Sequence, residues 1–404
     1  MSAALFDLAL RVAARDAGRP VPRLLHNPAP ARETAVAVVA RRTGQVVRVQ
    51  AAGPDGRTHS GTGPDGLVAI MRAAASGGGD LAGGPTALID SRATLRALAG
   101  LACSYADPTR CAGIDVAAGS ALAGWWVERA AHPGTSAVTD VLAVSRQRFV
   151  LGVAAGKDHA AAWRAALSVP NSIAGLHIWR HAITSGPLLP GLESLGEDDD
   201  WHLEAAQEAV QEHRSWDRPE TLQLAAARLA SRCDAADLYD AALLADPLWR
   251  ARGVHTGFVC HGEIAAGAGA EGNRVTMRAD RLDTRLKVGS SVTGWPGEPT
   301  TAMPDTENRL TGEVFATAVE DGALVVTIGG LRKSGYRPAA GETVTVIPAP
   351  PSVSVIRSRR TAVARLYRRR FSWLSQGSTP TAARRPVPLA VMIAAADEPD
   401  EPDT

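Results

Sequence analysis

The stretch from Thr34 to Gly53, TAVAVVARRTGQVVRVQAAG, contains two valine-rich runs on either side of Thr43 and Gly44. β-Branched residues favour strands, and a short turn that contains glycine is typical of the connection between two antiparallel strands. The stretch therefore predicts a β-hairpin near the beginning of a first domain.

Helix and strand patterns alternate after this hairpin. Apolar spacing predicts a helix at about 67–75, a buried strand in TALID (86–90) and a helix with Ser91 as its N-cap. The runs TSAVTDVLAVS (135–145) and RFVLGVA (148–154) predict further strands. Such alternation is typical of an α/β domain, which we place at residues 35–155. Residues 1–34 are expected to form an amphipathic helix over 3–17 and a proline-rich linker.

The two parts that follow differ in their apolar period. Residues 156–252 have apolar side chains three and four positions apart, as in WHLEAAQEAVQEH, which predicts a helical region. After Gly253 the period changes to two, and six short runs are separated by Gly, Asp, Asn and Pro. This pattern predicts a small β-barrel over 253–350, OB-like or SH3-like.

The chain of 404 residues is longer than one hydrophobic core usually allows. The expected fold class is therefore multidomain α+β: an N-terminal α/β domain, a helical middle segment, a small C-terminal β-barrel, and a basic helix with an acidic tail over 351–404.

The charge distribution is uneven, although the formal net charge is only +1. RSRRTAVARLYRRRFSWL, from Arg357 to Leu374, contains seven arginines, three aromatic residues and no acidic residue, whereas five of the last eight residues are acidic. A helix of about fourteen residues is expected here, with arginines on one arc and apolar residues on the other. We expected Arg359 and Arg360 to precede that helix.

Arginine forks match phosphate oxygens, and aromatic rings stack on bases, so this segment predicts binding to DNA or RNA through the phosphate backbone. The acidic tail would compete with nucleic acid for the arginines. The predicted nucleic-acid-binding residues are Arg357, Arg359, Arg360, Arg365, Arg368, Arg369 and Arg370 for phosphates, with Tyr367 and Trp373 for stacking.

Other interpretations of the same helix stay open. Its arginines could be merely solvated, or the helix could lie on an anionic membrane surface. It could also bind a protein partner through an apolar face. That face would consist of Val363, Leu366, Tyr367, Phe371 and Leu374.

An enzyme is the main alternative from another class, and an assembly or scaffold protein is the other. Asp90 ends a predicted strand in the α/β domain, where α/β enzymes often place a carboxylate, so a hydrolase or nuclease could be centred there. Asp107, Asp115 and Asp140 are further carboxylates in that domain, but their spacing does not group them. We expect no chemistry, and therefore no catalytic residue and no cofactor.

Two incomplete motifs support that expectation. GVAAGKD (152–158) has one residue too few between its glycines for a phosphate-binding loop and lacks the Ser or Thr after the lysine. HIWRH places His177 and His181 on one helical face, but the glutamate of a zinc protease is absent, so no metal is expected.

The cellular compartment is predicted from what the sequence lacks. The first twenty residues do not resemble a signal peptide, and no apolar run approaches the ~20 residues that span a bilayer. Four scattered cysteines form no C-x-x-C pair. These observations predict a cytoplasmic protein with reduced thiols and no membrane span.

Overall fold

The computed structural model describes residues 3–30, 32–76, 84–153, 159–217, 222–267, 273–351 and 353–368. The chain divides into two compact units. The larger unit consists of Met1–Pro219 and Ser231–Ile356, and the smaller consists of Glu220–Ala230 and Arg357–Thr404. The described residues form a mixed α+β fold with three sheets.

The largest open sheet lies in the N-terminal part and begins with the predicted hairpin. Its strand order is β4-β3-β2-β5-β6, with β5 and β6 parallel to β2. β3 is antiparallel to both β2 and β4. The strands are β2 (Ala35–Thr43), β3 (Val46–Ala52), β4 (Thr58–Thr62), β5 (Thr86–Ile89) and β6 (Val138–Asp140).

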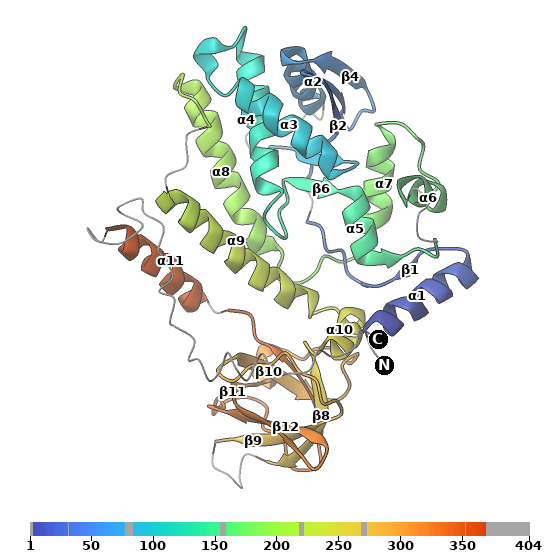
Figure 1. The fold of residues 1–404 in the computed structure, drawn as a ribbon, viewed down its shortest axis with the longest axis vertical. Coiled ribbons are helices and arrows are strands. Elements are labelled where there is room, and N and C mark those ends of the chain that lie inside the picture. The colour runs from blue at the N-terminus through green and yellow to red at the C-terminus, as the bar shows by residue number, and fades with distance from the viewer. Residues whose placement is uncertain are drawn as a thin grey trace, which may run out of the picture. The chain divides into compact units, whose positions relative to one another are not determined.

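Helices cover both faces of this sheet (Figure 1). Val36, Val38 and Ala40 of β2 pack with α2 (Pro64–Ala75), α3 (Arg92–Ser104) and α4 (Ile114–Arg129). The alternate residues Ala35 and Ala37 pack with α5 (Val141–Arg148), α6 (His159–Ala166) and α7 (Gly175–Thr184). Because successive residues of a strand point to opposite faces, β2 contributes to a separate core on each side of the sheet.

Several boundaries differ from the sequence-based expectations. Of the predicted strand 135–145, only Val138–Asp140 is a strand; it ends at Asp140, whose carboxylate accepts a hydrogen bond from the backbone amide of Ala143 (3.0 Å) and caps α5. The edge strand β4 and the helix α4 were not predicted. Among the described residues 148–153 of the next predicted strand, Phe149–Val150 alone forms a strand, β7, which pairs with β1 (Val21–Pro22).

The remaining helices agree with the predicted helical regions. They are α1 (Ala3–Ala17), α8 (Glu193–Gln211), α9 (Leu222–Leu243) and α10 (Pro247–Thr256). α10 extends three residues past Gly253, where the apolar period changes, and ends at Gly257 in a left-handed conformation. Its N-cap is the fully buried Asp246, whose carboxylate also accepts hydrogen bonds from the amides of Leu25 and His26.

All six predicted β runs after Gly253 form strands, which close into a ring. The order around the ring is β10-β11-β12-β9-β8-β13, and every neighbouring pair is antiparallel. β10, β11 and β12 follow one another, and the third returns to pair with β9, which is a Greek-key arrangement. We call these strands the closed sheet: β8 (Cys260–Ala266), β9 (Val275–Ala279), β10 (Ser291–Pro296), β11 (Leu310–Glu320), β12 (Ala323–Gly329) and β13 (Thr343–Pro348).

α10 packs against the closed sheet. Leu244, Val259, Trp295 and Ile347 form one buried cluster. Beside it, the fully buried Arg250 donates hydrogen bonds to the backbone carbonyls of Leu244, Ala245, Pro299 and Thr301. Trp249 and Val254 of α10 pack against this cluster, which is separate from the core inside the closed sheet.

Candidate functional site

The basic segment forms α11, which spans Val353–Arg368. The side chains of Arg357, Arg359 and Arg365 are exposed. The expectation that Arg359 and Arg360 precede the helix is wrong, because the helix begins at Val353, before both of them. Apolar residues at positions 353, 355 and 356 extend the helical pattern toward the preceding prolines.

Three arginine positions share one side of α11. At 3.6 residues per turn, positions 357, 365 and 368 fall within an arc of about 80° and extend over roughly 16 Å of the helix axis. One strand of duplex DNA carries a charge every 3.4 Å or so along its axis, so an arginine stripe of this length can meet several phosphates. α11 contains no acidic residue that would oppose this contact.

The rest of the predicted interface is described only in part. Arg360, Val363, Leu366, Tyr367 and Arg368 belong to α11, but the structure describes only their backbone. Arg369, Arg370, Phe371, Trp373 and Leu374 lie outside the described residues, as does the acidic tail. The proposed stacking by Tyr367 and Trp373 and the apolar face therefore remain predictions.

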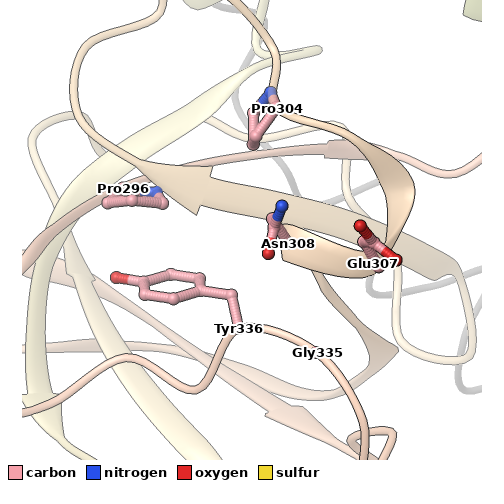
Figure 2. Close-up of a pocket in the computed structure, with 6 residues that line it drawn as sticks. All are labelled: Pro296, Pro304, Glu307, Asn308, Gly335 and Tyr336. Atoms are coloured by element: carbon pink, nitrogen blue, oxygen red, sulfur yellow. The ribbon is translucent and has the colours of Figure 1, made fainter.

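A pocket of about 480 Å³ beside the closed sheet was not predicted. Figure 2 shows the Tyr336 ring, the rings of Pro296 and Pro304 and the Asn308 side chain around one hollow, with Glu307 at its edge. These residues come from the end of β10, the turn before β11 and the loop before β13. These residues are far apart in the sequence, so no local pattern predicts that they form one pocket. The one sequence feature that could have pointed to it is a tyrosine in the basic loop LRKSGYRP (331–338).

The Tyr336 ring is fixed in the wall of this pocket. Its ring packs against the core of the closed sheet, and its hydroxyl donates a hydrogen bond to the Glu342 carboxylate. Burial, together with Glu342, raises the pKa of the Tyr336 hydroxyl above its ordinary value. Gly335 beside it has φ +137°, and an added Cβ would lie 2.8 Å from the backbone oxygen of Arg309. The loop can approach the turn this closely only because residue 335 is glycine.

A second hollow of about 530 Å³ shares Glu307 with the first. Polar side chains line it: Asp305, Thr306, Thr311, Arg332 and Ser334. Arg332, Lys333 and Arg337 of the same loop are exposed. On the neighbouring sheet surface the Arg274 guanidinium lies 3.7 Å from the centre of the half-exposed Phe315 ring. Arg332 thus lines the second hollow, and Tyr336, on the same loop, lines the first.

The alternative site at Asp90 lies at the carboxyl edge of the open sheet. The Asp90 carboxylate is paired with the Arg41 guanidinium and accepts hydrogen bonds from the hydroxyls of Ser91 and Thr94 at 3.2 and 2.9 Å. Asp140 ends the neighbouring strand, and burial raises its pKa, with the charge of Asp90 adding to that effect. The structure thus brings Asp90 and Asp140, two of the four suggested carboxylates, to one edge of the sheet. The charge of Asp90 is balanced by the Arg41 guanidinium.

The histidine pair does not converge on one ligand. His177 Nε2 lies 3.1 Å from the backbone oxygen of Ala52, and burial lowers the pKa of this imidazole, whereas His181 is exposed.

Cys260 is buried, and His261 on the opposite face of β8 lies 2.6 Å from the Asp280 carboxylate. The described part of the chain contains no group of three or more His, Cys, Asp or Glu side chains arranged to hold a metal ion.

The described helices were also searched for membrane spans, and none is both long and apolar enough to cross a bilayer. No protein-family model matches this chain, and neither a curated protein nor a solved structure matches it significantly.

Proposed function

We propose that this protein binds nucleic acid, mainly through phosphate-backbone contacts from α11, and carries out no chemistry of its own. The observation that supports this proposal is the helix Val353–Arg368, on which Arg357, Arg359 and Arg365 are exposed and no residue is acidic. Arginine forks bind phosphate oxygens in pairs, and positions 357, 365 and 368 share one side of the helix, along which a nucleic-acid strand can lie.

The closed sheet that precedes α11 in the chain supports the same proposal by analogy. Small β-barrels often present surfaces that bind oligonucleotides. We propose that the closed sheet acts as such a barrel. It has six strands, whereas an OB-fold has five, so its likeness to that fold is limited to size and Greek-key connection.

Neither alternative function is favoured by a specific observation. A hydrolase centred on Asp90 would have to release that carboxylate from Arg41, Ser91 and Thr94. A scaffold protein would form an oligomer or a stable complex that persists after nuclease treatment, and size-exclusion chromatography before and after treatment distinguishes it.

The test is a fluorescence-anisotropy titration with labelled single-stranded and duplex oligonucleotides. Replacing Arg357, Arg359 and Arg365 with Gln keeps helix propensity and should weaken binding at least about tenfold at low salt. The matched control variant has Gln in place of Arg11, Arg15 and Arg19, three exposed arginines in or after α1. Its affinity should differ from that of the wild type by less than about twofold. Absence of binding by the wild-type protein, or equal losses in both variants, would refute the proposal.

A further inference from the structure

The pocket at Tyr336 has the chemistry of a site for one flat ring. Tyr336 is half-buried, its ring is held by the core of the closed sheet, and its hydroxyl is engaged by Glu342. A ring fixed in this way loses little freedom when a second ring stacks on it. Pro296 and Pro304 supply apolar walls around the same hollow (Figure 2).

Asn308 gives this pocket a polar side chain that can form hydrogen bonds with the edge of a flat ring. Its side chain is exposed and makes no hydrogen bond within the part of the chain that the structure describes. A carboxamide offers one donor and one acceptor side by side, which matches the paired groups on the edge of a nucleobase. An asparagine that pairs with adenine N6 and N7 is the best-known case of this match.

The surroundings of the pocket suit a phosphate that follows the base. Arg332 lines the adjoining hollow with the hydroxyls of Thr306, Thr311 and Ser334. Lys333, Arg337 and Arg274 are exposed nearby on the same loop and on the sheet beside it. Asp305 and Glu307 oppose a phosphate but can accept hydrogen bonds from amino or hydroxyl groups.

An extended proline-rich peptide is the other class of ligand for a hollow lined by tyrosine and proline. Such peptides dock in grooves built from several aromatic rings. Tyr336 is the single aromatic residue among the six that line this pocket, and the loop that carries it also has the exposed cations Arg332, Lys333 and Arg337, which a neutral proline-rich peptide would not use.

We propose that this pocket receives one unpaired base of a single-stranded nucleic acid. The base stacks on Tyr336, its edge meets the Asn308 amide, and the adjoining phosphate meets Arg332. This inference rests on the proposed nucleic-acid-binding function and gives it a preference for single strands. The phosphate contacts of α11 supply affinity without any such preference.

The experiment uses the full chain and an oligothymidylate of about twelve nucleotides with one central 2-aminopurine, whose fluorescence falls when the base stacks. Wild-type protein should quench that fluorescence on binding. Tyr336→Leu should abolish the quenching and weaken binding about tenfold, while the dependence of affinity on salt stays unchanged. Asn308→Ala, at an exposed position that leaves the core intact, should weaken binding severalfold.

The outcomes separate the two proposals. If the wild-type chain binds the oligonucleotide and loses affinity with the α11 arginines, but neither Tyr336→Leu nor Asn308→Ala changes quenching or affinity, the pocket inference is wrong and the proposed function stands. If the wild-type chain binds no oligonucleotide, the proposed function fails as well. Displacement of the probe by an excess of a proline-rich decapeptide would assign the pocket to peptides and overturn the inference.

Discussion

The guanidinium carbon of Arg250 lies 5.2 Å from the centre of the Trp295 ring, and both side chains are fully buried. Burial lowers the pKa of Arg250 to about 10, so the side chain remains charged at neutral pH. The positive charge is distributed over backbone carbonyls from the end of α9 and from the turn after β10. This contact fixes α10 and the wall of the closed sheet to each other.

Replacing Arg250 with Met should destabilise the protein by about 3 kcal/mol, because four backbone carbonyls, two of them in buried hydrogen bonds, lose a charged donor at once. The measurement is urea denaturation of the full chain, followed by tryptophan fluorescence. Arg19→Met at an exposed position is the control and should change the unfolding free energy by less than about 0.5 kcal/mol. Equal stability of the two variants would show that Arg250 does not hold this junction.

From the contact between Arg250 and Trp295 we predict which fragment of the chain folds stably as the closed sheet. A fragment that begins at 253 loses Leu244, Trp249 and Arg250 and exposes Trp295, whereas one that begins at 243 keeps them. The longer fragment, 243–350, should melt cooperatively and at a higher temperature than 253–350. Equal melting temperatures, measured by circular dichroism, would make the sheet independent of α10.

We expect the buried imidazole of His132 to make the stability of the fold depend on pH. Burial, aided by the charges of Arg129 and Arg232, lowers the pKa of this imidazole from 6.5 to about 4. The folded state therefore favours the neutral imidazole, and the full stability of the fold is present above pH 6.5, where His132 is neutral in the unfolded chain as well. As the pH falls from there toward 4, the unfolded chain gains the proton first, and about 3 kcal/mol of stability should be lost.

His132→Gln should remove most of that dependence between pH 6.5 and 4, while His181→Gln at an exposed position should keep it. Urea denaturation at intervals of half a pH unit measures both. A wild-type stability that stays flat over this window would contradict the buried neutral imidazole.

Substitution of Asp90 tests whether the carboxyl edge of the open sheet has a catalytic function. If its carboxylate serves as the partner of Arg41, Asp90→Asn should lower the unfolding free energy by about 1 kcal/mol, since the pair is partly exposed. Divalent cations should not start phosphodiester cleavage by either protein. Metal-dependent cleavage by the wild type that disappears in Asp90→Asn would instead support the hydrolase alternative.

The sequence predicted elements well where one physical rule acts alone. The six strands of the closed sheet alternate between its core and its surface, and turn residues separate them, so their period was visible. α4 was missed because Val116–Trp126 is buried almost all round, including Gly119 and Gly124, and such a helix has no apolar stripe. β4, THSGT, was missed because this polar edge strand lacks alternating apolar residues.

Much less of the candidate site could be predicted. The charge of α11 is a property of one continuous segment and is plain in the sequence. Tyr336, Asn308 and Pro296 become neighbours only when the sheet closes, and no local pattern carries that information. Arg41 and Asp90 illustrate the same limit, because their pairing depends on β2 and β5 being adjacent.

The salt dependence of nucleic-acid affinity tests the central claim most directly. If about four arginines of the basic segment meet phosphates, a plot of log affinity against log salt on duplex DNA should have a slope near −3 to −4. Replacing Arg357, Arg359 and Arg365 with Gln should reduce its magnitude by about two, roughly one each for Arg357 and Arg365, which share one side of α11. The variant at Arg11, Arg15 and Arg19 should keep the wild-type slope. An unchanged slope in the α11 variant would contradict the account.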